Sequence, residues 1–431
     1  MSFLLSVFQA ICHVLLSMLM VLHPASAAKP GDANTAAEDA GSRVVLAAMR
    51  APDTGYWHTN EAQILDSWNR PVRIQGINWY GFETVRGVAG GLTVQDYRSI
   101  LDTIKRDGYN TVRLPFSNQM VETPFVPKDI AFSNAGGPIN EDLRGLNSLQ
   151  IMDKVVEYAG EVGLKVILDD HRSEAGDSAE ASGLWYTPGY PETAWIADWQ
   201  MLAARYKGNS TVVGMDLRNE PHGANADGAC WDCGGERDWH LAAGRAGNGI
   251  LKVNPKLVIF VEGTDVYNGD SAWWGGNLEG VRNSPVELAV HDQLVYSPHL
   301  YGPKTYRQPW FNAKTTPASL EAVWKKHWGY ISEWGMAPVW LGEFGTSNDA
   351  GDLEGSEPGT EGQWFGSLVV YLSRNPDVGW AIWALNGEDE DGLLDANYQF
   401  PVNGRKQQMM SSIMSPRLGA TQEVAGMEPL R

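Results

Sequence analysis

Eight short apolar segments alternate with amphipathic segments along most of this chain, and this alternation constrains the fold more than any other feature. Each apolar segment resembles a strand that is buried on both faces. The chain between two of them is long enough for a helix and its loops, so the pattern predicts βαβ units with parallel strands. The predicted strands are residues 72–79, 111–116, 164–170, 212–220, 257–262, 294–301, 339–344 and 379–385.

Apolar residues at spacings of three or four predict helices between these strands. Val94, Tyr97, Leu101 and Ile104 mark the first helix. Eight such units with right-handed crossovers close naturally into a (β/α)₈ barrel, known as a TIM barrel. We therefore predict one α/β catalytic domain over residues 49–415, with a small β-hairpin, residues 63–66 and 71–74, at its N-terminal end. The other predicted helices are near Met152–Ala159 and at residues 192–206, 236–253, 319–333, 361–373 and 404–414.

The ends of the chain differ in character from this pattern. Residues 1–27 contain an apolar run that is followed by Ala25-Ser26-Ala27, which is typical of a secretory signal peptide and its cleavage site. Because no Lys or Arg precedes the run, an uncleaved N-terminal anchor is the alternative. Residues 28–48 are predicted to be a flexible leader, and residues 416–431 a disordered tail. We expect a secreted protein, extracellular or periplasmic, that is monomeric and leaves the membrane after cleavage.

Charge and cysteine content restrict the partners. The formal net charge of −19 argues against nucleic acid, since binding to phosphates requires Lys and Arg, whereas a neutral polysaccharide is compatible with it. Cys12 lies in the predicted signal peptide, which leaves Cys230 and Cys233. In a secreted chain this pair is predicted to form a disulfide rather than half of a zinc site. No His, Asp and Glu cluster stands at metal-ligand spacing, and we expect neither a metal nor another cofactor.

Two predicted strands end in a glutamate. Glu220 follows the fourth strand in Asn219-Glu220-Pro221, and Glu343 ends the seventh in Gly342-Glu343-Phe344-Gly345. In a barrel the carboxyl ends of the strands meet on one face, so the two glutamates would face each other across its mouth. Cleavage of a glycosidic bond needs one protonated and one ionised carboxyl group, a requirement that this pair can meet. The alternative is that either residue is an ordinary surface glutamate.

Other polar and aromatic residues stand at or just beyond the carboxyl ends of different strands. Together with the two glutamates, their sequence contexts resemble glycoside hydrolase family 5, the retaining cellulase clan. The resemblance covers almost the whole chain after the predicted signal peptide, and Gly76-Ile77-Asn78-Trp79-Tyr80-Gly81-Phe82 is similar to the endoglucanase branch. The matching residues are Arg113, His171, Asn219, Glu220, His299, Tyr301, Glu343 and Trp383.

The resemblance implies a role for each glutamate. Glu343 would be the nucleophile, and Arg113 and the Tyr301 hydroxyl would keep it ionised, because a nearby cation favours the charged carboxylate. Glu220 would be the acid and later the base that deprotonates water. His299 would lie near both carboxyl groups.

The remaining matches imply contacts with the sugar. Asn219 would donate to a 2-hydroxyl group, and His171 would hold a hydroxyl of the same sugar. Pyranose rings present flat C–H faces, so indole rings are the expected platforms. Trp383 is the strongest candidate and Trp79 another. Weaker candidates are Trp185, Trp231, Trp273, Trp274 and Trp310.

These expectations point to an endo-β-1,4-glucanase that hydrolyses internal bonds of cellulose and related β-glucans by a retaining double displacement. A β-mannanase or another β-glycanase on the same scaffold is the alternative within this enzyme class. A carbohydrate-binding protein on an inactive barrel is disfavoured, because a binding protein does not need both carboxylates. A metallohydrolase is a more distant alternative.

Overall fold

The computed structural model describes residues 55–414 of the 431-residue chain. The predicted signal peptide, leader and tail lie outside these residues. Among the described helices, none is both long enough and apolar enough to cross a membrane.

Eight parallel strands form the centre of the molecule. Seven ladders join them in the order β13-β10-β9-β8-β5-β4-β15-β14. Parallel bridges between Tyr296 and Val339 and between His299 and Glu343 connect β13 to β14, so the sheet closes into the predicted (β/α)₈ barrel. The strands are β4 (Gln75–Asn78), β5 (Thr111–Ser117), β8 (Lys165–Arg172), β9 (Val212–Asp216), β10 (Val258–Val261), β13 (Leu294–Tyr296), β14 (Trp340–Phe344) and β15 (Gly379–Ile382).

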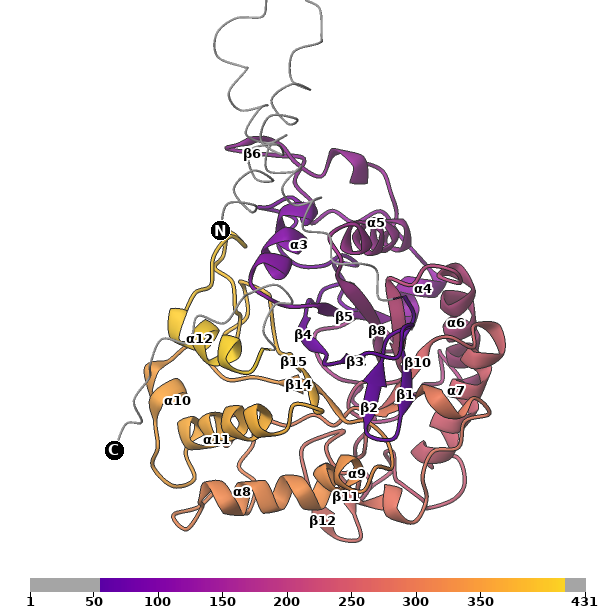
Figure 1. Ribbon diagram of the computed structural model, residues 1–431. Coiled ribbons are helices and arrows are strands. Elements are labelled where there is room, and N and C mark those ends of the chain that lie inside the picture. Colours follow the sequence, from indigo (N-terminus) through magenta and orange to yellow (C-terminus); the bar gives the residue numbers. More distant parts are fainter. Residues whose placement is uncertain (1–54, 415–431) are drawn as a thin grey trace, which may run out of the picture. The chain divides into compact units, whose positions relative to one another are not determined.

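Helices surround these strands, as Figure 1 shows. Each predicted helix overlaps an observed one, but the segment predicted as a single helix at 319–333 is divided by a π-helical segment, η4 (Lys325–Gly329). Two short helices, α4 (Asn118–Glu122) and α10 (Ala350–Glu354), were not predicted. The remaining helices are α3 (Tyr97–Arg106), α5 (Ser148–Glu161), α6 (Glu192–Arg205), α7 (Trp239–Val253), α8 (Pro317–Trp324), α9 (Tyr330–Glu333), α11 (Glu361–Arg374) and α12 (Gly404–Ser412).

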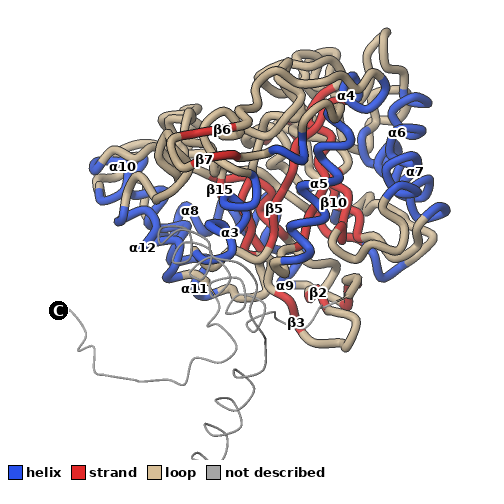
Figure 2. The backbone as a smooth tube through the Cα atoms, turned by 90° about the horizontal axis from the view of Figure 1, so that it is seen from above, coloured by secondary structure: helices blue, strands red, loops and turns tan. Residues whose placement is uncertain are grey.

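A small antiparallel sheet forms at one end of the barrel. The predicted hairpin is confirmed as β2 (Gln63–Leu65) paired with β3 (Pro71–Val72), and an unpredicted strand, β1 (His58–Asn60), pairs with β2. The Asp66 carboxylate accepts the backbone N–H groups of Trp68 and Arg70 and thereby stabilises the hairpin turn. In Figure 2, β2 and β3 lie at one end of the barrel, whereas α4, which follows the carboxyl end of β5, lies at the other.

The barrel interior next to this small sheet is apolar. Inward-facing side chains of the strands form a cluster in which Phe260 of β10 packs edge-on against Trp340 of β14, with ring centroids 4.8 Å apart. Ile64 of β2 and Trp57 belong to the same cluster. The half of the barrel interior next to the small sheet is therefore a packed core. The polar groups lie on the other side of this core, towards the carboxyl ends of the strands.

Candidate active site

A buried arginine forms the polar layer above the apolar cluster. Arg113, on β5, is fully buried, and its Nε donates to Asp216 Oδ2 on β9 at 2.9 Å. Its Nη2 lies 2.9 Å from Asp169 Oδ1 on β8, and its Nη1 donates to Asn78 Oδ1 on β4 at 3.1 Å. A buried charge is costly unless it is paired and hydrogen-bonded, and these strands supply the partners. Arg113 is thereby fixed in one orientation below the barrel mouth.

Glu343, the last residue but one of β14, lies directly above this arginine. Its Oε1 accepts Nη1 of Arg113 at 2.6 Å, and its Oε2 accepts the Tyr301 hydroxyl at 2.9 Å. Burial raises the pKa of Glu343, while Arg113 and the Tyr301 hydrogen bond act in the opposite direction. The two donors therefore favour the ionised form of this carboxyl group.

Glu220 lies on the opposite side of the barrel mouth, just past the end of β9. The predicted strand to residue 220 is too long, because β9 ends at Asp216 and Glu220 adopts a left-handed backbone with φ of 52°. Its backbone N–H donates to Glu262 Oε2 at 2.8 Å. Its carboxyl Oε1 accepts the indole N–H of Trp273 at 2.6 Å. These contacts hold Glu220 at the mouth although its backbone has left the sheet.

The two glutamates share one small space. One carboxyl oxygen of Glu220, one of Glu343 and one ring nitrogen of His299 all lie within 4.8 Å of one another. Burial and then the charge of Glu343 raise the pKa of Glu220 well above its usual range. Burial lowers the pKa of His299 well below its usual range, so its ring is neutral. The site thus combines one carboxyl group whose pKa is raised well above its usual range with another whose ionised form is favoured by Arg113 and Tyr301 against the effect of burial.

His171 and Asn219 stand beside this pair. His171, on β8, lies 2.8 Å from Asp169 Oδ2 through its Nδ1, and burial lowers its pKa to about 3. Asn219 accepts Nη2 of Arg113 at 3.1 Å through its Oδ1, which orients its amide. Both side chains are therefore oriented by buried charged residues, His171 by Asp169 and Asn219 by Arg113.

Trp383 carries an aromatic surface at the same rim. Its ring is partly exposed and stacks on His171, with centroids 5.7 Å apart, and on Tyr80, with centroids 5.2 Å apart and planes within 6°. Tyr80 was not predicted as a site residue, although it follows the first strand directly. The two rings are nearly parallel, and the exposed part of the Trp383 ring is an aromatic surface that a sugar can stack on.

Trp79 does not belong to this surface, and its predicted role as a platform is wrong. It is 0% exposed, and its indole N–H donates to the backbone carbonyl of Gly90 at 3.0 Å. Trp79 directly follows β4, in which side-chain directions alternate, and it packs in the core between the strands and helices. The weaker candidates Trp185 and Trp231 are also buried, whereas Trp273, Trp274 and Trp310 keep some exposed surface.

The sequence analysis did not predict the roles of several residues of the site. Asp169 and Asp216 bind the guanidinium group of Arg113, and Trp273 donates its indole N–H to Glu220. A signal for two of them was present. Asp216 ends the otherwise apolar β9, Asp169 follows three apolar residues of β8, and acidic residues in such buried positions are usually paired with a cation.

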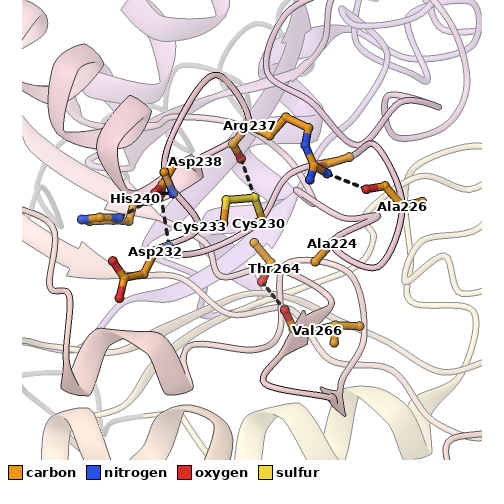
Figure 3. Close-up of a disulfide and its surroundings, with 12 residues drawn as sticks. Ala224, Ala226, Cys230, Asp232, Cys233, Arg237, Asp238, His240, Thr264 and Val266 are labelled. Carbon is orange, nitrogen blue, oxygen red and sulfur yellow. Dashed lines mark hydrogen bonds and ion pairs between the residues drawn. A yellow bond between two sulfur atoms is a disulfide. The ribbon is translucent and has the colours of Figure 1, made fainter.

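Cys230 and Cys233 are bonded to each other, with Cα atoms 6.0 Å apart, in the loop between β9 and α7. Figure 3 shows Asp238 beside the disulfide, between Asp232 and His240. The Asp238 carboxylate accepts the Asp232 N–H at 3.2 Å and lies 2.9 Å from Nδ1 of His240. The sulfur atoms are therefore not free to act as zinc ligands.

Four groups of His and carboxylate side chains within the described range 55–414 are close enough to share a cation. Two consist of site residues, around which Arg113 already supplies a positive charge. In the others, Asp238 accepts backbone N–H groups and Asp270 pairs with Lys326. The absence of a metal stays a prediction from the sequence. The groups are Asp216-Glu262-His299, Glu220-His299-Glu343, Asp232-Asp238-His240 and Asp270-Glu279-His327.

Comparison with known proteins is consistent with this arrangement. A cellulase family model, described as glycosyl hydrolase family 5, matches residues 66–389. An endoglucanase of Paenibacillus polymyxa is 44% identical over 384 residues, which cover 88% of this chain and 92% of that protein. The major extracellular endoglucanase of Xanthomonas campestris pv. campestris is 36% identical over 81% of this chain and 69% of its own length.

Solved structures give the same result. The hyperthermophilic endocellulase of the archaeon Pyrococcus horikoshii has a TM-score of 0.76 and 35% identity to this chain, and the match covers 85% of this chain and 100% of the endocellulase chain. Another structure of that endocellulase is a complex with cellotetraose, with a TM-score of 0.75 at the same identity.

Proposed function

Since this chain belongs to glycosyl hydrolase family 5, we propose that it is a secreted endo-β-1,4-glucanase that hydrolyses cellulose and related β-glucans with retention of anomeric configuration. Membership of the family makes the chain a glycoside hydrolase. The preference for β-1,4-glucan is supported by the relatives named above, which are endoglucanases and an endocellulase.

The proposal of retention depends mainly on one observation. Carboxyl oxygens of Glu220 and Glu343 lie within 4.8 Å of each other. Retaining glycosidases have carboxyl groups about 5–5.5 Å apart, whereas inverting enzymes need about 6.5–9.5 Å to admit a water molecule between sugar and base. The short separation favours direct attack on the sugar by one of the two carboxylates.

The surroundings of each glutamate support its role. Glu343, held by Arg113 and Tyr301, attacks the anomeric carbon, while Glu220 donates a proton to the leaving oxygen. The product of this step is a covalent glycosyl ester on Glu343. Once Glu220 has lost its proton, it removes a proton from water, which attacks the same carbon and releases Glu343.

The sugar-binding roles follow from the same geometry. Asn219 can donate its amide N–H to the 2-hydroxyl group, because Arg113 engages its oxygen and leaves its nitrogen free for the substrate. His171 can accept a sugar hydroxyl through Nε2, because its Nδ1 donates to Asp169 and the neutral ring carries only one proton. Trp383, with Tyr80 stacked against it, would stack on a sugar of the chain.

A proton NMR time course with cellopentaose tests this function. We expect cleavage of an internal bond with the β-anomer appearing first and the α-anomer later, as mutarotation proceeds. Initial release of the α-anomer would contradict retention. A β-mannanase or other β-glycanase on the same scaffold would hydrolyse mannan in preference to carboxymethylcellulose, and an inactive carbohydrate-binding barrel would release no reducing ends from any soluble β-glucan.

Secretion and the monomeric state are part of the proposal. The apolar run and the Ala25-Ser26-Ala27 sequence support export to the periplasm or the medium. Expression with and without residues 1–27 tests this. We expect activity outside the cytoplasm only for the full chain, with a mature N-terminus near residue 28, and a monomer by light scattering.

A further inference from the structure

Trp273 is distinguished from the other partly exposed tryptophans by two contacts. Its indole N–H donates to Glu220 Oε1 at 2.6 Å, and its ring packs edge-on against Tyr301, with centroids 5.1 Å apart. Tyr301 in turn donates to Glu343. One indole ring therefore links the surroundings of both carboxyl groups.

The loop that carries Trp273 is fixed on both sides. Beyond the ring, Gly275 has a φ of 69°, and a Cβ there would lie 2.0 Å from Glu262 Oε2, so only glycine allows this close approach to the site. The Gly275 N–H donates to the carbonyl of Pro221, the residue after Glu220. The turn that carries the ring is thus attached to the segment that carries its acceptor.

Before the ring, the loop forms a short hairpin of β11 (Val266–Tyr267) and β12 (Asp270–Ser271). Asp270 contacts Lys326 and lies 3.0 Å from Nε2 of His327, both in η4. This anchorage restricts movement of the hairpin. The indole N–H is therefore directed at Glu220 before any substrate binds.

An indole N–H can only donate a hydrogen bond. The atom it reaches, Oε1, must act as an acceptor, which favours protonation of the other carboxyl oxygen, Oε2. His299 Nδ1 also approaches Oε1, but at 3.3 Å it is the more distant contact. The shorter contact, from Trp273, is expected to dominate.

The remaining groups around Glu220 are charged or titratable, and most come from other strands. Glu343 opposes the ionised form of Glu220, Arg113 favours it, and Asp169 opposes it. These charges change the pKa of Glu220 but do not decide which of its two oxygens holds the proton. The neutral indole N–H of Trp273 does so, because it contacts one oxygen only. The groups that face Glu220 are Arg113, Asp169, Glu262, His299, Tyr301, Glu343 and Trp273.

We propose that Trp273 is a positioning residue that holds Oε1 of Glu220 as an acceptor, directs the transferable proton to Oε2, and stabilises the carboxylate after the proton has left. This inference rests on the proposed role of Glu220 as acid and base. It assigns to Trp273 a contact with the enzyme's own carboxyl group, in addition to any contact with sugar.

The test compares Trp273→Phe with Trp274→Phe. The first substitution keeps an aromatic ring and removes the N–H donor. The second makes the same change in the adjacent residue. Trp274 stacks on His222, and its indole is not the donor to the Glu220 carboxyl group. For Trp273→Phe the alkaline limb of the kcat/KM profile with cellopentaose should move up by about one pH unit, because loss of a donor to the carboxylate raises the pKa of Glu220. Trp274→Phe should leave that limb in place, whatever its effect on KM.

A second substrate separates positioning from general damage. With a dinitrophenyl cellobioside, whose leaving group needs no proton, kcat/KM of Trp273→Phe should fall by a smaller factor than kcat/KM with cellopentaose does. The melting temperatures of both variants verify folding, and Trp273→Leu, which also lacks a donor, replaces Trp273→Phe if the latter does not fold. An unchanged alkaline limb in a folded variant, or an equal shift in Trp274→Phe, would overturn the inference.

Failure of the proposed function would look different. It would appear as a wild-type protein that releases no sugar from cellopentaose. The inference about Trp273 is then decided by a ¹³C NMR titration of the Glu220 carboxyl, identified by its absence from Glu220→Gln. Its pKa should rise in Trp273→Phe and not in Trp274→Phe, and equal values in both variants would refute the contact.

Discussion

The two halves of the barrel interior are built from the same eight strands but differ in chemistry. Near β2 and β3 the interior is filled by apolar side chains such as Phe260, Val295 and Trp340. Towards the carboxyl ends it holds Arg113 with buried carboxyl groups on four strands or strand ends, those of Asp169, Asp216, Glu262 and Glu343. The difference indicates that one half supplies stability and the other a preorganised charge distribution.

The charged half has an excess of acidic groups. One guanidinium group faces four carboxyl groups, and burial raises the pKa of Asp169 to about 6 and that of Asp216 to about 7. Such an arrangement is a poor source of stability, since the desolvation of ions offsets their attraction. The raised pKa values instead keep carboxyl groups of the site able to hold a proton near neutral pH. We therefore expect substitutions in the charged half to lower turnover more than substitutions in the apolar half do.

The largest effect on turnover is expected for Glu343→Gln. The amide is nearly isosteric but cannot form the glycosyl ester, so kcat should fall by on the order of 10³-fold or more while cello-oligosaccharide binding remains. Steady-state kinetics and calorimetric titration with cellotetraose measure the two quantities. Turnover above a few percent of wild type would exclude Glu343 as the nucleophile.

Glu220→Ala should lower kcat on cello-oligosaccharides by roughly 10²–10⁴-fold, because the leaving oxygen is no longer protonated. On an activated aryl cellobioside, azide should restore part of the activity by attacking the intermediate in place of water. The product to look for by mass spectrometry is the β-glycosyl azide. Its absence, or formation of the α-azide, would argue against retention.

The pH dependence of kcat/KM of the wild-type protein tests the charged half of the barrel without any substitution. Glu220 must be protonated to act as acid, so kcat/KM is lost as the pH rises through its pKa. Because burial and Glu343 raise this pKa well above its usual range, activity should persist to clearly higher pH than an ordinary glutamate, with a pKa of about 4.3, would allow. An alkaline limb near pH 4–5 would contradict the proposed surroundings of Glu220.

Phe260→Ala examines the apolar half. The side chain is fully buried against Trp340, so its truncation should lower the free energy of unfolding by about 3–5 kcal/mol. Urea unfolding measures the loss, and kcat per folded molecule should stay near wild type. A matched control is Trp68→Ala, since this tryptophan is 52% exposed on the hairpin and its removal should change stability by less than about 0.5 kcal/mol. A tenfold fall in kcat for Phe260→Ala would show that the two halves are not separable.

The sequence predicted the barrel well because its signals are local. Strands that are buried on both faces are continuous apolar runs, and the residues at their carboxyl ends necessarily meet on one face. This is why Glu220, Glu343 and Tyr301 could be assigned to one site before their distances were known, whereas His299 was assigned through the family resemblance.

The errors concern side-chain direction and long-range contacts. Trp79 stands one residue from a site residue and yet points into the core, because alternate strand residues face opposite sides. The contact between Trp273 and Glu220 joins residues 53 positions apart through a turn whose geometry depends on Gly275, and neither periodicity nor spacing reports such a contact.

Trapping of the covalent intermediate tests the double displacement most directly. The protein would be incubated with an activated 2-deoxy-2-fluoro cellobioside, digested and analysed by mass spectrometry. The account predicts one label per molecule, on the peptide that carries Glu343, and none in Glu343→Gln. Labelling of Glu220 or another residue, or turnover without any trapped ester, would contradict it.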